Sequence, residues 1–175
     1  YFVSELARQA VTVAIAGDGG DEVFAGYEKY TKDDIENRLR QKFPQWMRKR
    51  VFPTLADFFA LSELPLFRKA KSLLTSLSVS PEYGFYITNS QIDDRHWREL
   101  SKQSLKDALA DYHPSKITLD VYKGANGPNH LANILYTDIK TYLTGGILVK
   151  VDRMSMANSL EVRAPILDME ILFDQ

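Results

Sequence analysis

The sequence predicts a mostly α-helical chain of the α/β class, with few parallel strands. Helical spacing of apolar residues dominates the 175 residues, whereas residues 11–16 form a continuous apolar, partly β-branched run. Such a run is typical of a strand covered on both faces in a parallel sheet. A hydrophobic content of 45% allows a sizeable core. Because one strand cannot form a sheet, we expect its partners to be missing or to lie outside this chain.

The first elements follow one another closely. Residues 4–9 have the pattern of a helix end, and the predicted strand then stops at Gly17. Residues 17–22 are rich in glycine and acids, and a helix is expected to begin there because acidic residues favour the first turn. Strand, glycine-rich turn and helix start form one local unit.

The middle of the chain is predicted to be helical from Asp33 onward. Prolines at positions 44, 53 and 65 separate the segments, because proline disrupts a helix interior. The expected helical segments are residues 34–42, 55–61, 66–77, 93–100 and 105–112. Residues 123–129 are expected to form a loop, since glycine and proline suit turns.

The strongest helical pattern follows this loop. Its apolar residues recur at helical spacing and form one stripe: Leu131, Ile134, Leu135, Ile139, Tyr142 and Leu143. Asp138 lies on the same stripe, where a lone acid is unexpected. Gly145 and Gly146 are predicted to end the helix.

Charge and cysteine content exclude several classes of protein. Lys+Arg 22 against Asp+Glu 23 gives a net charge of -1, without the basic excess that nucleic-acid binding requires. The absence of cysteine excludes disulfides, thiolate zinc sites and cysteine nucleophiles within the chain. No apolar run approaches the roughly 20 residues of a membrane-spanning helix. We therefore expect a soluble, cytoplasmic protein that binds neither nucleic acid nor membrane.

The first candidate site is the segment from Ala16 to Glu22. Successive glycines expose backbone N–H groups, and the helix that follows adds its positive end, so an anion can bind there. Asp18 and Asp21 would repel a phosphate unless a divalent cation lay between them, and Mg²⁺ is commonly held by one or two carboxylates plus phosphates. The equally weighted alternative is a tight turn whose acids cap the next helix.

The second candidate site is the segment 148–168, in which charged and apolar residues alternate. Its charged members could form an ion network: Lys150, Asp152, Arg153, Glu161 and Arg163. From spacing alone, such a network is favoured over a catalytic role.

Other candidates are weaker. The three histidines, His96, His113 and His130, lack the spacing of metal ligands. Residues 46–50 could contact an anionic partner, but a solvated helix face is the favoured interpretation. The aromatic cluster at residues 83–86 is most simply core.

Two segments resemble motifs of the asparagine synthetase family, from its C-terminal, ATP-dependent amide-forming domain. They are AIAGDGGDEVFAGYEKY at residues 14–30 and LVKVDRMSMANSLEVRAPILD at residues 148–168, with Tyr142-Leu143 just before the second. The resemblance implies a mostly α-helical fragment of an α/β adenine nucleotide alpha hydrolase-like (PP-loop ATPase) domain. Residues 1–175 would then be the C-terminal portion of a synthetase domain, without the family's SGGxDS nucleotide loop and N-terminal glutaminase domain.

The resemblance assigns roles to residues of the glycine-rich loop. Ala16 and Gly17 would border ATP, and Gly19 and Gly20 would cradle pyrophosphate. Asp18 lies where many members have Glu, at a position linked to formation of the β-aspartyl-AMP intermediate. Because Asp is shorter by one methylene, its reach toward substrate or metal differs from theirs.

The remaining implied roles concern charge. Asp21 would bind Mg²⁺, and Lys150 would neutralise negative charge as pyrophosphate leaves or ammonia attacks. Arg153 could add a second positive group, but an ion pair with Asp138 or Asp152 is the favoured interpretation. The other charged residues of the second motif, Glu161, Arg163 and Asp168, are expected to be structural.

By resemblance, the chain is part of a ligase of asparagine biosynthesis that uses ATP, Mg²⁺, aspartate and ammonia from glutamine. Alone, it is expected neither to hydrolyse glutamine nor to make asparagine. The alternatives are a related synthetase with another carboxylate acceptor and a non-catalytic helical interaction module on the same scaffold. An exposed strand edge at residues 11–16 also allows self-association, so a homodimer is an open expectation.

Overall fold

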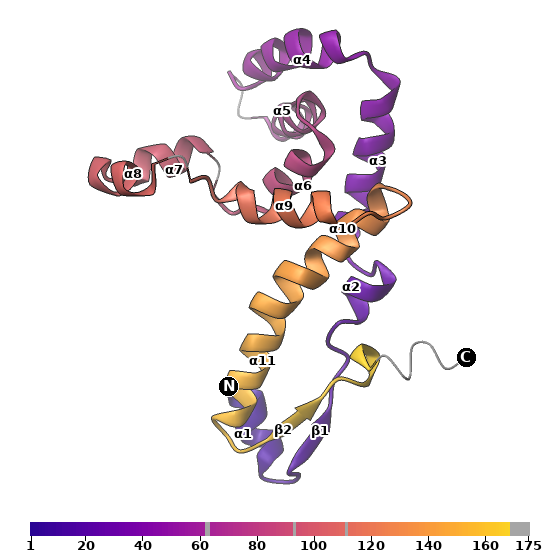
Figure 1. Ribbon diagram of the computed structural model, residues 1–175, viewed down its shortest axis with the longest axis vertical. Helices are drawn as coiled ribbons and strands as arrows, with labels where there is room; N and C mark the ends of the chain where they lie inside the picture. The colour runs from indigo at the N-terminus through magenta and orange to yellow at the C-terminus, as the bar shows by residue number, and fades with distance from the viewer. Residues whose placement is uncertain (62–63, 93, 111, 169–175) are drawn as a thin grey trace. The chain divides into compact units, whose positions relative to one another are not determined.

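A computed structural model describes residues 1–61, 64–92, 94–110 and 112–168 of the chain (Figure 1). The chain divides into two compact units. Unit 1 combines residues 1–30 with the segment from residue 135 onward, and unit 2 comprises residues 31–134. Unit 1 is therefore discontinuous in sequence, and both motifs of the sequence analysis belong to it.

Unit 1 holds the strands and a long helix. Its N-terminal elements are α1 (Phe2–Arg8), β1 (Val13–Ile15) and α2 (Gly20–Phe24). The C-terminal part continues from α10 (His130–Asp138), which begins in unit 2, into a π-helix (Ile139–Ile147) and α11 (Leu148–Met156). β2 (Glu161–Arg163) and a 3₁₀ turn (Pro165–Leu167) complete it.

The two strands pair in parallel, Val13 opposite Glu161 and Ile15 opposite Arg163. The Ala16 N–H donates to the Arg163 carbonyl at 2.9 Å just beyond the paired residues. The expectation of a single strand was wrong, because β2 has three residues and two of them are charged, which hides it from a hydrophobic pattern. Ile15 is 78% exposed, so the predicted cover on both faces of the strand is not found within the described residues.

The long helix does not end at its paired glycines. Gly145 and Gly146 lie inside the π-helix, which runs directly into α11, so the predicted stop was wrong. In a π-helix the backbone bonds shift to i→i+5. Hydroxyls supplement those bonds, since Thr141 donates to the Thr137 carbonyl at 2.7 Å and Thr144 to the Lys140 carbonyl at 2.8 Å.

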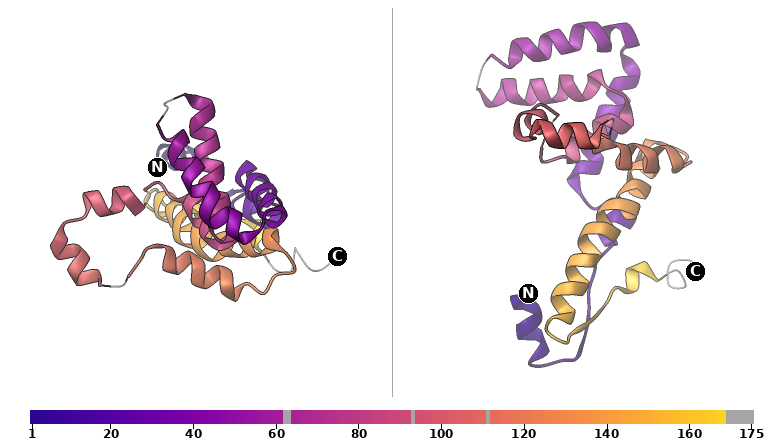
Figure 2. Two further views of the ribbon diagram at one scale, coloured as in Figure 1. Left: turned by 90° about the horizontal axis from the view of Figure 1, so that it is seen from above. Right: turned by 60° about the vertical axis from the view of Figure 1, so that its left-hand side comes forward.

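Unit 2 is helical throughout its described part. Its helices are α3 (Glu28–Lys42), which begins in unit 1, α4 (Gln45–Phe59), α5 (Pro65–Ser78), α6 (Pro81–Asn89), α7 (Asp94–Leu100), α8 (Gln103–Leu109) and α9 (Ser115–Gly124). Figure 2 shows α4 alongside α5, and α6 packs against both α5 and α9. None of the helices in the described ranges is long and apolar enough to cross a membrane.

The predicted helices of unit 2 correspond to α3, α4, α5, α7 and α8, with two corrections. Pro53 lies inside α4 instead of bounding it. The helical patterns of α6 and α9 escaped prediction. Residues 93 and 111, which belong to two predicted helical segments, lie outside the described residues.

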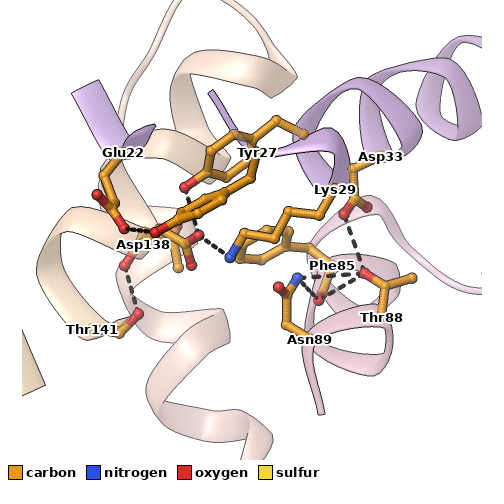
Figure 3. A network of polar contacts seen from close by, with 11 residues as sticks. Glu22, Tyr27, Lys29, Asp33, Phe85, Thr88, Asn89, Asp138 and Thr141 are labelled. Atoms are coloured by element: carbon orange, nitrogen blue, oxygen red, sulfur yellow. Dashed lines mark hydrogen bonds and ion pairs between the residues drawn. The ribbon is translucent and has the colours of Figure 1, made fainter. Parts of the chain in front are cut away.

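A buried arginine links the helices at the centre of unit 2. Arg40 is 3% exposed, and its Nη2 donates to the Ser76 carbonyl at 2.9 Å. A Cβ at Gly84 would lie 2.7 Å from the same Nη2, so α6 approaches Arg40 through a glycine. Of the aromatic residues expected in the core, Phe85 is 1% exposed, whereas Tyr83 and Tyr86 are half-buried. The Thr88 hydroxyl donates to the Asp33 carboxylate at 3.1 Å and ties α6 to α3 (Figure 3).

The buried His130 is expected to make the stability of the folded chain depend on pH. Burial, together with the nearby Arg40 guanidinium, lowers its pKa from 6.5 to about 4. The unfolded chain therefore takes up a proton at a higher pH than the folded chain does. The contribution of His130 to the free energy of unfolding is therefore complete above about pH 6.5. It decreases by up to about 3 kcal/mol as the pH falls toward about 4.

Urea unfolding across this pH range tests that loss. His130→Gln should flatten the dependence on pH, whereas His96→Gln, at an exposed position, should leave it unchanged. Equal slopes for the wild type and His130→Gln would contradict the assignment.

Candidate functional site

The glycine-rich loop connects β1 to α2, and the end of the second motif packs against it. Gly19 has φ 89°, and a Cβ there would lie 2.2 Å from Leu167 Cδ2. A Cβ at Gly20 is 3.3 Å from Ile166 Cδ1. Together with the β1–β2 pairing, these contacts bring two segments more than a hundred residues apart in sequence into one site.

Gly19→Ala is expected to disturb this loop strongly. A left-handed backbone costs an L-residue about 1–2 kcal/mol, and the new methyl group would also displace Leu167. We expect the variant to unfold at lower urea concentration, with an added loss of loop function. Gly17→Ala is the matched control, because a Cβ at Gly17 meets nothing within 4 Å. Equal stability of the two variants would contradict the packing of Leu167 on the loop.

The two aspartates of the loop differ in their surroundings. Asp18 is half-buried and Asp21 is exposed. The Asp21 carboxylate lies against Gly26, where a Cβ would be 2.0 Å from Oδ1, and the Gly26 N–H donates to the Asp21 carbonyl at 2.9 Å. Gly26 thus leaves room for this carboxylate, a requirement that sequence spacing alone did not reveal.

The alternative of acids that cap α2 finds limited support. The N-cap residue is Gly19, and no side-chain hydrogen bond caps α2 within the described structure. Because α2 has five residues, its dipole is small, and the loop's glycine N–H groups and any bound cation must supply most of the positive potential.

A cluster of tyrosines and charged residues lies next to the loop (Figure 3). We call it the tyrosine–lysine cluster; its members are Glu22, Tyr27, Lys29, Tyr30, Tyr142 and Asp138. Glu22 is 1% exposed and accepts a hydrogen bond from the Tyr27 hydroxyl at 2.8 Å. The buried Asp138 accepts a hydrogen bond from the Tyr30 hydroxyl at 2.8 Å and forms an ion pair with Lys29.

Aromatic rings surround the ammonium group of this cluster. Lys29 Nζ lies 5.2, 5.1 and 4.9 Å from the ring centres of Tyr27, Tyr30 and Tyr142. Contacts of this length are favourable cation–π interactions. Burial raises the pKa values of Tyr27 and Tyr30, as do the carboxylates they bond. Both phenols therefore remain neutral hydrogen-bond donors.

The cluster joins the first motif to the long helix. Asp138 is the last residue of α10, so it connects Lys29 and Tyr30 to the same continuous helix that carries Lys150. Of the two partners expected for Arg153, Asp138 was wrong, because the Asp138 carboxylate pairs with Lys29. The position of Asp138 on an apolar stripe was a signal of an internal partner, but the sequence did not identify that partner.

The second motif forms α11 and β2. Lys150 and Arg153 are exposed on α11. Arg163 Nε contacts Glu161 Oε1 at 2.8 Å, consistent with the structural role expected for both residues. Of the predicted site residues, Ala16–Gly19 thus form the loop, and Gly20 and Asp21 form the first turn of α2. Lys150 lies in the same unit, on α11.

The donor set of the loop fits a magnesium–phosphate ligand. No group of three or more metal-ligating side chains occurs in the described ranges. Mg²⁺ does not require one, since it keeps waters and shares its coordination with phosphate oxygens. Asp18 and Asp21 supply carboxylates of the type that the ion prefers.

Comparison with known proteins decides the family. A family model described as asparagine synthase matches residues 1–172. The chain belongs to the asparagine synthase family. The match includes the helical unit 2, in which no family motif was identified from the sequence.

Three curated members of the asparagine synthase family illustrate the similarity. The chain is 32% identical over 174 residues to asparagine synthetase (glutamine-hydrolyzing) 1 of Bacillus subtilis strain 168, covering 99% of this chain and 26% of that protein. It is 32% identical over 175 residues to a putative asparagine synthetase (glutamine-hydrolyzing) of Mycobacterium bovis, covering 98% and 24%. A third, putative synthetase 2 of Methanocaldococcus jannaschii, is 33% identical over 158 residues, covering 89% and 28%.

The chain thus spans about a quarter of the length of the first two of these relatives. No solved structure matches the chain significantly.

Proposed function

We propose that this chain is the C-terminal portion of an ATP-dependent amidoligase domain with the PP-loop ATPase fold. Such a ligase would activate aspartate as β-aspartyl-AMP and transfer ammonia to it, giving asparagine, AMP and pyrophosphate. The observation that carries the proposal is the joining of the two motifs in unit 1, by β1–β2 pairing and by contact of Leu167 with Gly19. The relatives' names add asparagine synthesis as the expected reaction.

The proposed reaction has two steps. An oxygen of the substrate carboxylate attacks the α-phosphorus of ATP, and pyrophosphate leaves. The nitrogen of ammonia then attacks the acyl carbon and loses a proton to solvent, and AMP leaves with the bonding electron pair.

Residues of the loop would serve the first step. The backbone of Ala16 and Gly17 would border ATP, while Gly19 and Gly20 would cradle pyrophosphate. Asp18 would face the acyl phosphate. A bound Mg²⁺ would supply charge neutralisation on the phosphates. The exposed carboxylate of Asp21, held beside Gly26, is the proposed ligand to that ion.

Lys150 would serve both steps through its positive charge. Negative charge builds on the phosphate oxygens as each leaving group departs, and a preorganised cation stabilises it. The continuous helix from Asp138 to α11, tied to Lys29, provides the rigid support that such a cation needs.

Exchange of labelled pyrophosphate into ATP tests the proposal in the complete polypeptide that carries this segment. Aspartate should stimulate the exchange, because adenylation is reversible before ammonia attacks. Stimulation by another carboxylic acid alone would instead favour a related amide-forming synthetase. No exchange with any candidate acid would favour a non-catalytic module. The isolated chain is expected to be inactive, and cytoplasmic location and a homodimer stay predictions.

Asp21→Asn should severely weaken Mg²⁺-dependent turnover in the complete polypeptide and raise the Mg²⁺ concentration that turnover requires. The amide is a poorer ligand than the carboxylate, so half-maximal activity is expected at about tenfold higher Mg²⁺ or beyond. Circular dichroism should show an unchanged fold, since Asp21 is exposed. Glu28→Gln, another exposed acid, is the control. An unaltered magnesium titration for Asp21→Asn would remove the metal assignment.

A further inference from the structure

Unit 2 contains a cavity whose charge is not explained by the proposed synthetase site. The cavity measures about 560 Å³ and lies between α3, α4, the α5–α6 connection and α9. We call it the α3–α4 cavity. Among its lining residues are three cations and three polar groups: Arg40, Arg48, Lys49, Gln41, Gln45 and Ser80. No lining residue belongs to either family motif, and none is acidic within the described part of the chain.

Two of the lining guanidinium groups have donors without partners. Arg40 is 3% exposed, and no hydrogen-bond acceptor meets its Nε among the described residues. The buried Nε of Arg48 likewise has no acceptor in that part of the structure. A buried donor without an acceptor costs about 1–3 kcal/mol, and more when the group is charged. Both arginines line the cavity, so an anion bound there would lie near two positively charged side chains.

The charge around Arg40 is only partly balanced. The Glu36 carboxylate, which accepts a hydrogen bond from Ser76, acts favourably on Arg40, whereas Arg48 repels it. Burial and this repulsion lower the pKa of Arg40. The Asp33 carboxylate also acts favourably on Arg40. Lys49 adds a further positive charge to the lining, so the three lining cations outnumber the two carboxylates that act on Arg40.

We propose that the α3–α4 cavity binds a small phosphate-bearing anion, either a phosphate ester or free phosphate or pyrophosphate. Arginine donors that present planar forks suit phosphate oxygens better than they suit a monovalent halide. The volume also accommodates a group larger than inorganic phosphate. The cavity shares no residue with the proposed ATP loop. The proposal does not depend on the synthetase reaction.

Calorimetric titration of the chain with phosphate, pyrophosphate and AMP, in EDTA, tests the proposal. EDTA removes the Mg²⁺ that binding at the loop would require, so saturable binding under these conditions is expected to come from the cavity. Tighter binding of AMP would identify a phosphate ester as the ligand class, and tighter binding of pyrophosphate would identify a free oxyanion. Absence of saturable binding of all three at millimolar concentration would overturn the proposal.

Matched variants locate the binding. Arg48→Gln should weaken it at least about tenfold, because one charge-assisted hydrogen bond is lost. Arg50→Gln removes an exposed cation of the same helix outside the lining and should leave affinity within about twofold. Equal losses in the two variants would show an unspecific charge effect and would refute the site.

A second substitution tests the same site in case the Arg48→Gln variant does not fold. Gln45→Glu places a negative charge in the lining at an exposed position and should also weaken binding at least about tenfold. Gln91→Glu makes the same change at an exposed position outside the lining and should have no effect. Binding that Gln45→Glu leaves unchanged, with the fold intact by circular dichroism, would contradict the proposal.

Discussion

Lys150→Ala is expected to slow amide formation by about 100- to 1000-fold in the complete synthetase polypeptide. Removing one preorganised charge from a transition state commonly has an effect of this size. Because Lys150 is exposed on α11 and its truncation empties no core space, the fold should persist. Single-turnover rates, with thermal unfolding as the check on folding, measure the effect.

Lys140→Ala is the control for that prediction. Lys140 lies on the same continuous helix, and its Nζ contacts the Tyr136 ring at 5.8 Å, so its loss removes an equal charge without touching the motif. Its rate should stay within about twofold of the wild type. Should Lys150→Ala react as fast as Lys140→Ala, Lys150 would have no role in the chemistry.

Asp138→Ala should destabilise the chain by about 2–4 kcal/mol. The substitution leaves Lys29 without its carboxylate and the buried hydroxyl of Tyr30 without its acceptor. The side chain of Lys29 is 29% exposed, so water moderates the loss. Urea unfolding of the chain measures it.

Two comparisons distinguish loss of the Asp138–Lys29 pair from the general effect of removing an acidic residue. Asp152→Ala, an exposed acid on α11, should change stability by less than about 0.5 kcal/mol. In a double-mutant cycle, Lys29→Met should offset part of the cost of Asp138→Ala, because the unpaired ammonium is then removed. Additive effects of these two substitutions would contradict a direct pair.

The sequence predicted elements with long, regular patterns. The helix after residue 130 was predictable because burial of one face imposes a period that a sequence displays. The strand before Gly17 was predicted from a continuous apolar run, and it exists although Ile15 is exposed. β2 was not predicted, because a strand of three residues with two charges has no recognisable hydrophobic pattern. The helix through Gly145 and Gly146 was also not predicted, since flanking hydrogen bonds outweigh the small helix propensity of glycine.

The candidate site was predictable to the extent that family motifs mark it. Those motifs placed the loop and Lys150, whereas the tyrosine–lysine cluster depends on a long-range contact. Lys29 and Asp138 lie far apart in sequence. Lys29 alone resembles an ordinary surface charge, and the apolar stripe around Asp138 indicated an internal partner without identifying it. Only the fold shows that Asp138 is buried and that Lys29 neutralises it.

The parallel pairing of β1 with β2 has a consequence for biosynthesis. The first strand leaves the ribosome well before its partner, and residues 31–134 must be translated between them. Helices of that intervening stretch can form from local contacts while β1 is still unpaired and Ile15 is exposed to solvent. The glycine loop can acquire its packing from Leu167 only after translation has passed that residue, so it is expected to be among the last parts to assemble.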